Sequence, residues 1–513
     1  MAISCIKNIR VNTVPEIEWK TLIRADRTLA VPFRLDLAEQ QHSAVICEQI
    51  VRVMPGKRLV AFGTWDDQPV VIKLFYETHS ASRHFKREVS GVEALVEYRI
   101  PTPALIYKGT AKNKRIKVLI FERIVDAFNL DEIWQSKTCR QTLLPLMRAV
   151  TIELATQHVL GVVQRDLHFK NILIKGKHIY TLDGGSIEFT DGLLPKKQSL
   201  EHLALFFAQL GVGTEEIQRE LFHTYTKARG WLVKKADVEC LQAALKKWNN
   251  SRWKRFEKKI ARNSTAFGLH KNSKAFIMHD RNDESAELMG FLNQPELIFS
   301  QHGTEILKAG RSSTVIKALI DNKPYIIKRY NMKNSLHWLR RCLRPSRAAT
   351  SWRLAHLLRH FGVATARPVA FIERRFLGLR WKSYFVMEYV EGSDLASVFS
   401  HYAKDDSDYD NLAALVVVLF NNLAKLSMTH GDLKATNILI REGCPVLIDL
   451  DGMVTHQTQS SLDRAVKKDM KRFMKNWDAL PSVRALFQTL LAKGAAAVIL
   501  SAAKDRHDGG SLS

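Results

Sequence analysis

Two stretches of the sequence carry the same set of side chains that could act on a phosphate group. QRDLHFKNILI begins at Gln164 and HGDLKATNILI begins at His430, so an Asp-x4-Asn pattern occurs twice. In each case one more aspartate follows, and a lysine within an apolar segment precedes. The two sets are Lys73, Asp166, Asn171 and Asp183, and Lys328, Asp432, Asn437 and Asp449.

These residue types suit phosphoryl transfer, in which catalysis rests on positioning and on neutralising the charge of the phosphate oxygens. Lys73 and Lys328 would hold nucleotide phosphates, while the asparagine and the later aspartate of each set offer the oxygen ligands that Mg²⁺ prefers. Asp166 and Asp432 would orient an acceptor hydroxyl and take its proton. Any one of these residues alone would be read as a surface lysine or a helix cap. The recurrence of the whole set at matched spacing argues against that reading.

The segments around each set predict the elements that position it. KRLVAFG, the turn WDDQ and PVVIKLF predict a hairpin that carries Lys73, and STVIKALI, DNKP and YIIKRY predict one that carries Lys328. A helical segment, two further strands and a long apolar helix follow in each half, the apolar helices near residues 141–160 and 411–427. The Asp-x4-Asn stretch comes directly after that helix. This order predicts an α+β fold.

The long period of the repeat predicts a duplicated domain within the 513 residues. We expect a first domain at residues 1–267, a polar connector at 268–286 and a second domain at 287–505, followed by a frayed tail at 506–513.

Taken together, these motifs resemble the protein-kinase-like superfamily, through VVIK, QRDLHFKN and LDGG in the first half and YIIK, HGDLKATN and IDLD in the second. The RDLHxxNIL type of loop, the RIPTP and GVATARP segments and the DMKRFMKNW stretch are most similar to the bacterial lipopolysaccharide core kinases, the Kdo and heptose kinase family. The resemblance implies two tandem bilobal domains, each with a β-rich N-lobe and a helical C-lobe. It also implies ATP and Mg²⁺ as cofactors and a sugar hydroxyl of the lipopolysaccharide inner core as the acceptor.

The sequence departs from the protein-kinase pattern at several positions. Neither half has a GxGxxG loop, Gln164 replaces the loop histidine in the first half, and Gly431 replaces the loop arginine in the second. We expect Glu88 to orient Lys73. The second half has no acidic residue between Lys328 and Glu373, and Ser351 stands near the position where one is expected. A lysine without its carboxylate is less well positioned, so the second half is either an active kinase or a pseudokinase.

A net charge of +25 indicates a polyanionic neighbour, and nucleic acid, an anionic membrane surface and phosphorylated substrates would all satisfy it. The stretch at 246–262 has eight basic residues and interleaved Trp248, Trp253, Phe256 and Ile260, and a second basic stretch runs over 333–353. Such segments suit an anionic membrane surface, although the apolar stripe of the first could instead pack on its own domain. Nucleic acid ranks lowest because no nucleic-acid-binding motif accompanies the charge.

The first twenty or so residues contain no apolar run of the length that a secretion signal needs, and no apolar run in the sequence reaches the length of a spanning helix. The six cysteines form no CxxC pair. We therefore expect a cytoplasmic protein that lies peripherally at the inner face of the inner membrane.

The leading hypothesis is an ATP-dependent kinase of the lipopolysaccharide core. Two enzymatic alternatives are a Ser/Thr protein kinase and a small-molecule phosphotransferase of the aminoglycoside or choline type. A third, of another class, is a pseudokinase scaffold for envelope assembly.

Overall fold

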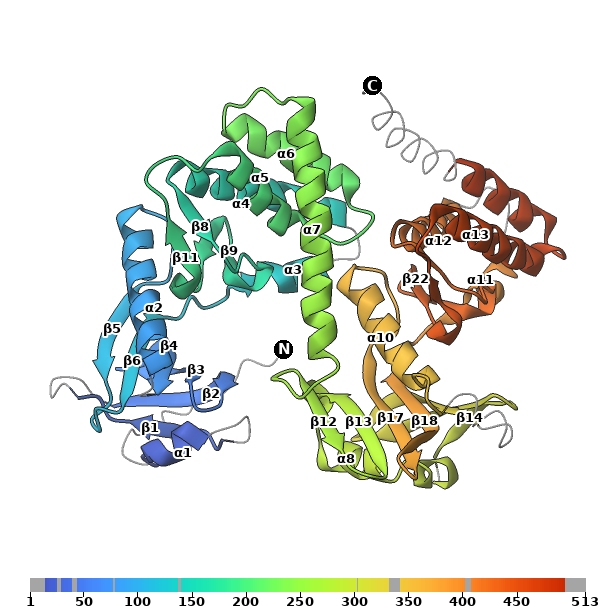
Figure 1. Ribbon diagram of the computed structural model, residues 1–513, viewed down its shortest axis with the longest axis horizontal. Helices are drawn as coiled ribbons and strands as arrows, with labels where there is room; N and C mark the ends of the chain where they lie inside the picture. Colours follow the sequence, from blue (N-terminus) through green and yellow to red (C-terminus); the bar gives the residue numbers. More distant parts are fainter. Residues whose placement is uncertain are drawn as a thin grey trace. The chain divides into compact units, whose positions relative to one another are not determined.

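The chain divides into two compact units, each of which mixes helices with sheet (Figure 1). Unit 1 comprises the described residues up to Gln209 together with Glu216–Lys246, and unit 2 comprises Leu210–Glu215 and the described residues from Lys247 onward. The computed structural model describes residues 14–24, 29–38, 44–76, 79–136, 140–301, 303–331, 342–401 and 407–493. Residues 494–505 and the expected tail at 506–513 lie outside these ranges.

Unit 1 contains a six-stranded antiparallel sheet of order β1-β2-β3-β4-β6-β5. Its strands are β1 (Phe33–Leu35), β2 (Val45–Met54), β3 (Arg58–Trp65), β4 (Gln68–Tyr76), β5 (Leu105–Thr110) and β6 (Ile116–Glu122). The expected hairpin is confirmed as β3 and β4, whose turn residues Asp66 and Asp67 have φ angles of 49° and 59°. Aspartate tolerates this left-handed conformation, and the turn sets the register that places Lys73 within β4.

Helices and short strands make up the rest of unit 1. The helices are α1 (Trp19–Arg24), α2 (His79–Glu97), α3 (Leu130–Ser136), α4 (Leu144–Val159), α5 (Lys196–Phe207) and α6 (Glu215–Ala228). Two small sheets bracket the Asp-x4-Asn stretch, formed by β7 (Phe128–Asn129) with β9 (Ile172–Lys175) and β10 (His178–Thr181), and by β8 (Val162–Gln164) with β11 (Ile187–Phe189). The boundary between the units falls inside α7 (Lys235–Lys259).

Unit 2 contains a seven-stranded sheet of order β12-β13-β17-β18-β16-β15-β14. Its strands are β12 (Phe267–Lys271), β13 (Ala275–Asp280), β14 (Glu305–Ala309), β15 (Ser313–Ile320), β16 (Lys323–Tyr330), β17 (Pro368–Phe376) and β18 (Leu379–Glu388). The expected second hairpin is confirmed as β15 and β16, with Asp321 and Asn322 at its turn. The order β15-β16-β18-β17 repeats the order β3-β4-β6-β5 of unit 1, with a lysine-bearing strand at the same place in each.

The expected connector at 268–286 is wrong, because these residues build part of the second sheet. β12 pairs with β13, and β13 pairs with β17. In β13, Ala275 and Ile277 are buried in the core on one face of the sheet and Met278 in the core on the other, so both sides of the segment face apolar residues. The polar residues that suggested a linker lie in the turn between the two strands and at the ends.

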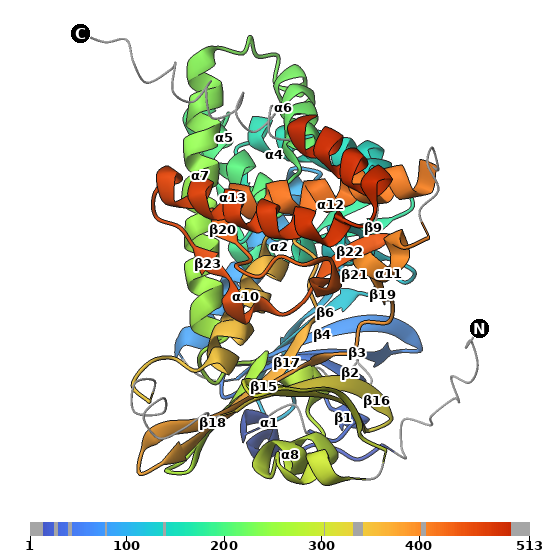
Figure 2. The same cartoon turned by 90° about the vertical axis from the view of Figure 1, so that its right-hand side faces the viewer.

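The helical part of unit 2 contains α10 (Arg347–His360), α11 (Leu395–Phe399), α12 (Ser407–Lys425), α13 (Gln459–Met474) and a helix over 481–493, while α8 (Ala286–Asn293) packs against the sheet. Figure 2 shows α12 and α13 side by side, and the rings of Phe420 and Phe473 lie 4.9 Å apart between them. Short strands β19 (Ser393–Asp394), β21 (Ile438–Arg441) and β22 (Cys444–Leu447) form one small sheet, and β20 (Met428–Thr429) pairs with β23 (Val454–Thr455).

The apolar stripe of the 246–262 stretch packs on unit 2. Trp253 and Ile260 are buried in the core of that unit, and Phe256 packs against it. Lys254, Arg255, Lys258 and Lys259 remain exposed. The stripe is therefore used by the fold, and only the basic face of this stretch is open to a partner. Much of the second basic stretch, at 332–341, lies outside the described residues.

Within the described residues, the helices are all too short or too polar to span a bilayer.

Candidate active site

The two Asp-x4-Asn stretches adopt the same local structure in the two units. Each passes through one turn of 3-10 helix, η3 (Phe169–Asn171) or η7 (Ala435–Asn437), before a strand begins. Asn171 Nδ2 donates a hydrogen bond to the carbonyl of Asp166 at 2.9 Å, and Asn437 Nδ2 donates to that of Asp432 at 2.8 Å. These bonds commit each amide NH₂ group to the loop and leave the amide oxygen as the atom that can face a cation.

The later aspartate of each set is brought beside the asparagine by backbone hydrogen bonds. The amide of Leu182 donates to the carbonyl of Asn171 at 2.8 Å, and that of Ile448 donates to Asn437 at 2.9 Å. The next residues, Asp183 and Asp449, have left-handed φ angles of 65° and 60°. A non-glycine residue held in this conformation is strained, and such strain is common where a side chain must be aimed at a site.

In unit 1 the strand lysine pairs with the expected glutamate. Lys73 Nζ on β4 forms an ion pair with Glu88 on α2, and the Glu88 side chain is buried. Burial alone would raise the pKa of Glu88, but the adjacent Lys73 ammonium more than offsets this and lowers the pKa. The pKa of nearby Asp183 is raised, first by burial and then by the negative charge of Glu88.

A close backbone approach explains how α2 delivers Glu88 to this position. A Cβ atom at Gly91 would lie 1.9 Å from the carbonyl oxygen of Gly184, in the 3-10 turn that follows Asp183. Any larger residue at position 91 would push the helix away from that turn. We expect Gly91→Ala to weaken the Lys73–Glu88 pair and to destabilise unit 1 by about 1–3 kcal/mol, measured as a shift in the urea unfolding transition. Gly290→Ala, on helix α8 where a Cβ meets nothing within 4 Å, is the matched control, and equal effects of the two changes would contradict this account.

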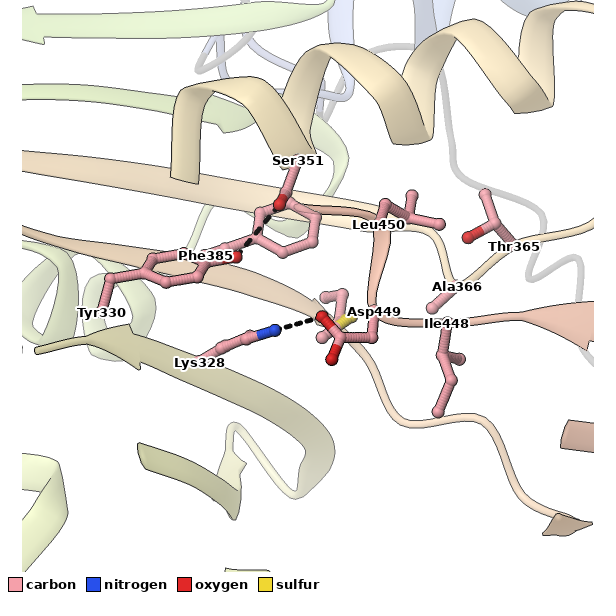
Figure 3. Close-up of a pocket in the computed structure, with 10 residues that line it drawn as sticks. Lys328, Tyr330, Ser351, Thr365, Ala366, Phe385, Ile448, Asp449 and Leu450 are labelled. Atoms are coloured by element: carbon pink, nitrogen blue, oxygen red, sulfur yellow. Dashed lines mark hydrogen bonds and ion pairs between the residues drawn. The ribbon is translucent and has the colours of Figure 1, made fainter. Parts of the chain in front are cut away.

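In unit 2 the strand lysine has different partners. Lys328 on β16 is buried and pairs with Asp449, and Figure 3 shows its ammonium pointing at that carboxylate. It also lies 3.4 Å from Asp451 Oδ1. Helix α10, which corresponds in order to α2, contains no acidic residue, and its first residue Arg347 instead forms an ion pair with Asp451. Two aspartates of one loop thus neutralise Lys328 where a helix glutamate does so in unit 1.

The two carboxylates of this cluster titrate differently. Burial would raise the pKa of Asp449, but a hydrogen bond shared with Asp451 and the Lys328 ammonium together lower it. Burial and the same shared hydrogen bond raise the pKa of Asp451. Asp449 is therefore the more firmly ionised of the pair and the better cation ligand.

A cavity of about 10 Å³ lies beside Lys328, and the hydroxyls of Tyr330 and Ser351 are 3.0 Å apart at its wall (Figure 3). It is far smaller than the several hundred Å³ of a typical ligand pocket, so it has no room for a nucleotide while Lys328 and Asp449 are paired. Its lining residues are Lys328, Tyr330, Ser351, Thr365, Ala366, Phe385, Met387, Ile448, Asp449 and Leu450.

In unit 2, Asp432 and its loop are held by Lys434 and by two residues of α13 that sequence reasoning missed. Arg472 Nη1 on α13 lies 2.5 Å from Asp432 Oδ1, and Lys434 Nζ lies 3.2 Å from Oδ2. Asp469, also on α13 and buried, accepts hydrogen bonds from the amides of His430 and Gly431 at 2.7 and 3.0 Å. Both α13 residues belong to the DMKRFMKNW stretch. An amphipathic helix has charged residues on its solvent side in any case, so the sequence alone did not indicate that these two bind the loop.

Comparison with known families bears on this unit. Residues 309–493 match the model of the lipopolysaccharide kinase (Kdo/WaaP) family. The match lies within unit 2 and includes Lys328, Asp432, Asn437 and Asp449, which supports a phosphotransferase of the kinase type. No curated protein matches the chain.

The structure explains two departures from the kinase loop pattern. Gln164 Nε2 donates to the carbonyl of Leu182 at 2.7 Å, and His430 Nε2 donates to that of Ile448 at 3.0 Å, so glutamine and histidine make the same contact in the two units. Gly431 has a φ of 77°, and a Cβ there would lie 2.3 Å from the carbonyl oxygen of Gly452. An arginine at this position would require a different backbone path.

Unit 1 anchors its loop through a buried chain of hydrogen bonds instead of an aspartate. His202 Nε2 donates to the carbonyl of Gln164 at 2.8 Å, which leaves His202 Nδ1 as the acceptor for His158 at 2.7 Å. His158 Nδ1 then accepts from the Tyr225 hydroxyl, which accepts from Arg229 at 2.9 Å. Every link in this direction requires both histidines to be neutral.

This chain predicts acid sensitivity of unit 1. Burial lowers the pKa of His202 to about 4, below its ordinary value, so the unfolded state binds more protons as the pH falls below about 6.5. The stability that depends on neutral His202 is complete above that pH and declines towards pH 4, by about 3 kcal/mol. We expect urea unfolding midpoints of wild type to fall more steeply over this window than those of His202→Gln. Parallel pH profiles would contradict the assignment.

Proposed function

We propose that this chain is an ATP- and Mg²⁺-dependent kinase that phosphorylates a heptose or Kdo hydroxyl of the lipopolysaccharide inner core. The observation that carries the proposal is the family match at 309–493, which contains one complete set of phosphate-handling residues. The second set, in unit 1, has the same backbone contacts around Asn171 and Asp183. This likeness supports two tandem kinase-like bilobal domains.

The residues present fit a magnesium ion. Mg²⁺ takes few protein ligands, commonly one or two carboxylates together with substrate phosphates. The described residues contain no group of three or more histidine, cysteine, aspartate or glutamate side chains that could hold a metal on their own. Asn437 and Asp449 in unit 2, and Asn171 and Asp183 in unit 1, would hold the ion as a pair of oxygen ligands. When bound, Mg²⁺ would neutralise charge on the phosphate oxygens.

The side chains of unit 2 divide the remaining tasks. Asp432 would orient the sugar hydroxyl and take its proton as that oxygen bonds to the γ-phosphorus and the bond from this phosphorus to the departing ADP breaks. Arg472 holds Asp432 from one side and Lys434 contacts it from the other, so the carboxylate is confined to one orientation. Lys328 would hold nucleotide phosphates. Because Lys328 is paired with Asp449 in this structure, binding of a nucleotide requires that pair to open.

Unit 1 is a second candidate for nucleotide binding. Lys73 already has its helix glutamate, Glu88, so it is positioned without any contact to Asp183 comparable with the pair in unit 2. We propose that unit 2 performs the transfer that the family match supports, and that unit 1 also binds Mg-ATP through Lys73, Asn171 and Asp183. Asp166 has the same place in its loop as Asp432.

The acceptor is tested by a panel assay with full-length protein and γ-labelled ATP. We expect label in the lipopolysaccharide core acceptor and none in a protein substrate, an aminoglycoside or choline. Label in protein alone would favour the Ser/Thr kinase alternative, and label in the small molecules would favour the aminoglycoside or choline type. Absence of any thermal shift with Mg-ATP would favour a scaffold and overturn the proposal.

We also propose that the protein works in the cytoplasm at the inner face of the inner membrane, where its acceptor is anchored. The net charge of +25 and the exposed lysines and arginine at 254–259 support an anionic surface as the neighbour.

A further inference from the structure

The tip of the β17–β18 hairpin in unit 2 exposes an apolar residue in a costly conformation. Phe376 pairs with Leu379, so Leu377 and Gly378 form a two-residue turn with φ angles of 50° and 78°. The Leu377 side chain is 86% exposed. Figure 2 shows this orange hairpin projecting from the sheet, away from α12 and α13.

Fold stability does not account for leucine at this position. Two-residue turns of this type favour asparagine, aspartate and glycine, because a leucine Cβ is strained at positive φ. Leu377 also gains almost nothing from burial. A single exposed leucine is common, but here its neighbours Phe376 and Trp381 are 55% and 39% exposed, with ring centroids 6.0 Å apart. The tip is therefore an apolar cluster that the fold leaves open.

Basic side chains surround this cluster. Arg375 N donates to the carbonyl of Lys274 at 2.8 Å, which brings the β12–β13 turn against the tip. An open hollow of about 480 Å³ is lined by Ser273, Lys274, Arg374, Arg375, Phe376, Leu377 and Gly378. Among the described residues, no acidic side chain forms an ion pair with Lys274, Arg374 or Arg375. Glu373, which is adjacent in sequence to Arg374, is buried and pairs with Arg380 instead.

We propose that the β17–β18 tip inserts into an anionic lipid bilayer, with Leu377 and Phe376 at the level of the acyl chains and the surrounding cations at the lipid phosphates. An apolar tip with a basic collar has the polarity profile of that interface. The proposal rests on the membrane-surface part of the proposed function and identifies the residues that make the contact. The apolar stripe at 246–262, which was the earlier candidate for an apolar membrane contact, is buried in unit 2 and cannot make it.

The test is flotation of the full-length protein with vesicles. We expect binding to vesicles of phosphatidylcholine with phosphatidylglycerol, and roughly tenfold weaker binding for Leu377→Asn, because one largely exposed leucine no longer enters the apolar layer. Asparagine suits the turn, so the unfolding midpoint of Leu377→Asn should stay level or rise. The matched control is Leu232→Asn in unit 1, where the side chain is 88% exposed and binding should not change.

The cationic collar is tested separately. Lys274→Gln with Arg375→Gln should weaken binding to the anionic vesicles roughly 25-fold, since each basic residue near such a surface contributes about fivefold. The same pair should have little effect on pure phosphatidylcholine vesicles. Equal flotation of wild type and Leu377→Asn would overturn the proposal. The proposal would also be overturned if Leu377→Asn changed the oligomeric size of the protein or its binding to duplex DNA but left flotation unchanged. The tip would then contact a second copy of the chain or a nucleic acid and not a bilayer.

Catalysis is measured in parallel on a water-soluble, delipidated core acceptor. Leu377→Asn should phosphorylate it at the wild-type rate. If flotation depends on Leu377 but no phosphate is transferred, the membrane contact stands and the kinase proposal fails. If phosphate is transferred but flotation ignores Leu377, the kinase proposal stands and this inference fails.

Discussion

Replacing Asp432 by asparagine is expected to slow phosphate transfer to the core acceptor by roughly 100- to 10,000-fold, the range attributed to general base catalysis. Asparagine keeps the shape of the side chain but cannot take a proton from the acceptor hydroxyl. Because the role proposed for Asp432 is on the acceptor hydroxyl and not on the nucleotide, Mg-ATP affinity should change by less than about threefold. Initial rates with labelled ATP, together with Mg-ATP titrations, measure both quantities.

Asp166→Asn is the matched control for that change, since Asp166 occupies the same place in the unit 1 loop and its backbone carbonyl accepts the same asparagine hydrogen bond. If unit 2 performs the transfer, Asp166→Asn should leave the core phosphorylation rate within a few fold of wild type. A full rate in Asp432→Asn combined with loss in Asp166→Asn would place the transfer in unit 1 and contradict the assignment.

Replacing Lys328 by methionine is expected to destabilise unit 2 by about 3–5 kcal/mol at neutral pH, because a buried charge cluster loses one of its cations. Lys328 is buried and pairs with both Asp449 and Asp451, so its removal leaves two adjacent carboxylates with Arg347 as the remaining cation. Urea unfolding of the full chain measures the loss. Lys323→Met is the control, since Lys323 begins the same strand but is exposed, and its effect should stay within about 0.5 kcal/mol.

The effect of Lys328→Met should also depend on pH. In the wild type the pKa of Asp449 is lowered, so its stabilising contribution is present at neutral pH and declines as the pH falls through the acid range. In the variant the two carboxylates repel each other without the lysine between them, which favours binding of a proton by one of them. Their repulsion disappears once that proton is bound. The difference in stability between wild type and variant should therefore shrink as the pH falls from 7 towards 4. A constant difference would show that Lys328 contributes packing and not charge.

Much of this arrangement is visible in the sequence because it follows from local patterns. Alternating apolar residues around Asp-Asp and Asp-Asn turns predict the hairpins that carry Lys73 and Lys328, and the repeat predicts two similar halves. The pairing of Lys73 with Glu88 could be predicted because the glutamate lies on the next helix. The lack of an acidic residue on α10 was equally visible. It predicted a less well positioned lysine, whereas Lys328 is paired with Asp449 and Asp451.

The replacement partners could not be predicted, because they depend on contacts between distant segments. The only feature of the sequence that pointed to Asp451 was its position two residues after Asp449. Its contact with Arg347 joins this loop to the start of a helix about a hundred residues earlier. Asp469 and Arg472 lie on α13, and from the sequence alone their charges are explained by exposure to solvent. Only the fold places Asp469 against the backbone of His430 and Arg472 against Asp432. In the same way, the polar ends of β12 and β13 concealed two strands that pair with β17.

The most direct test of the central claim is transfer of label from the γ-phosphate of ATP to a lipopolysaccharide core acceptor by the full-length protein, compared with the Asp166→Asn, Asp432→Asn double variant. The account predicts Mg²⁺-dependent labelling of a sugar hydroxyl by the wild type and none above background by the double variant. Absence of labelling by a folded wild-type protein, or undiminished labelling by the double variant, would contradict it.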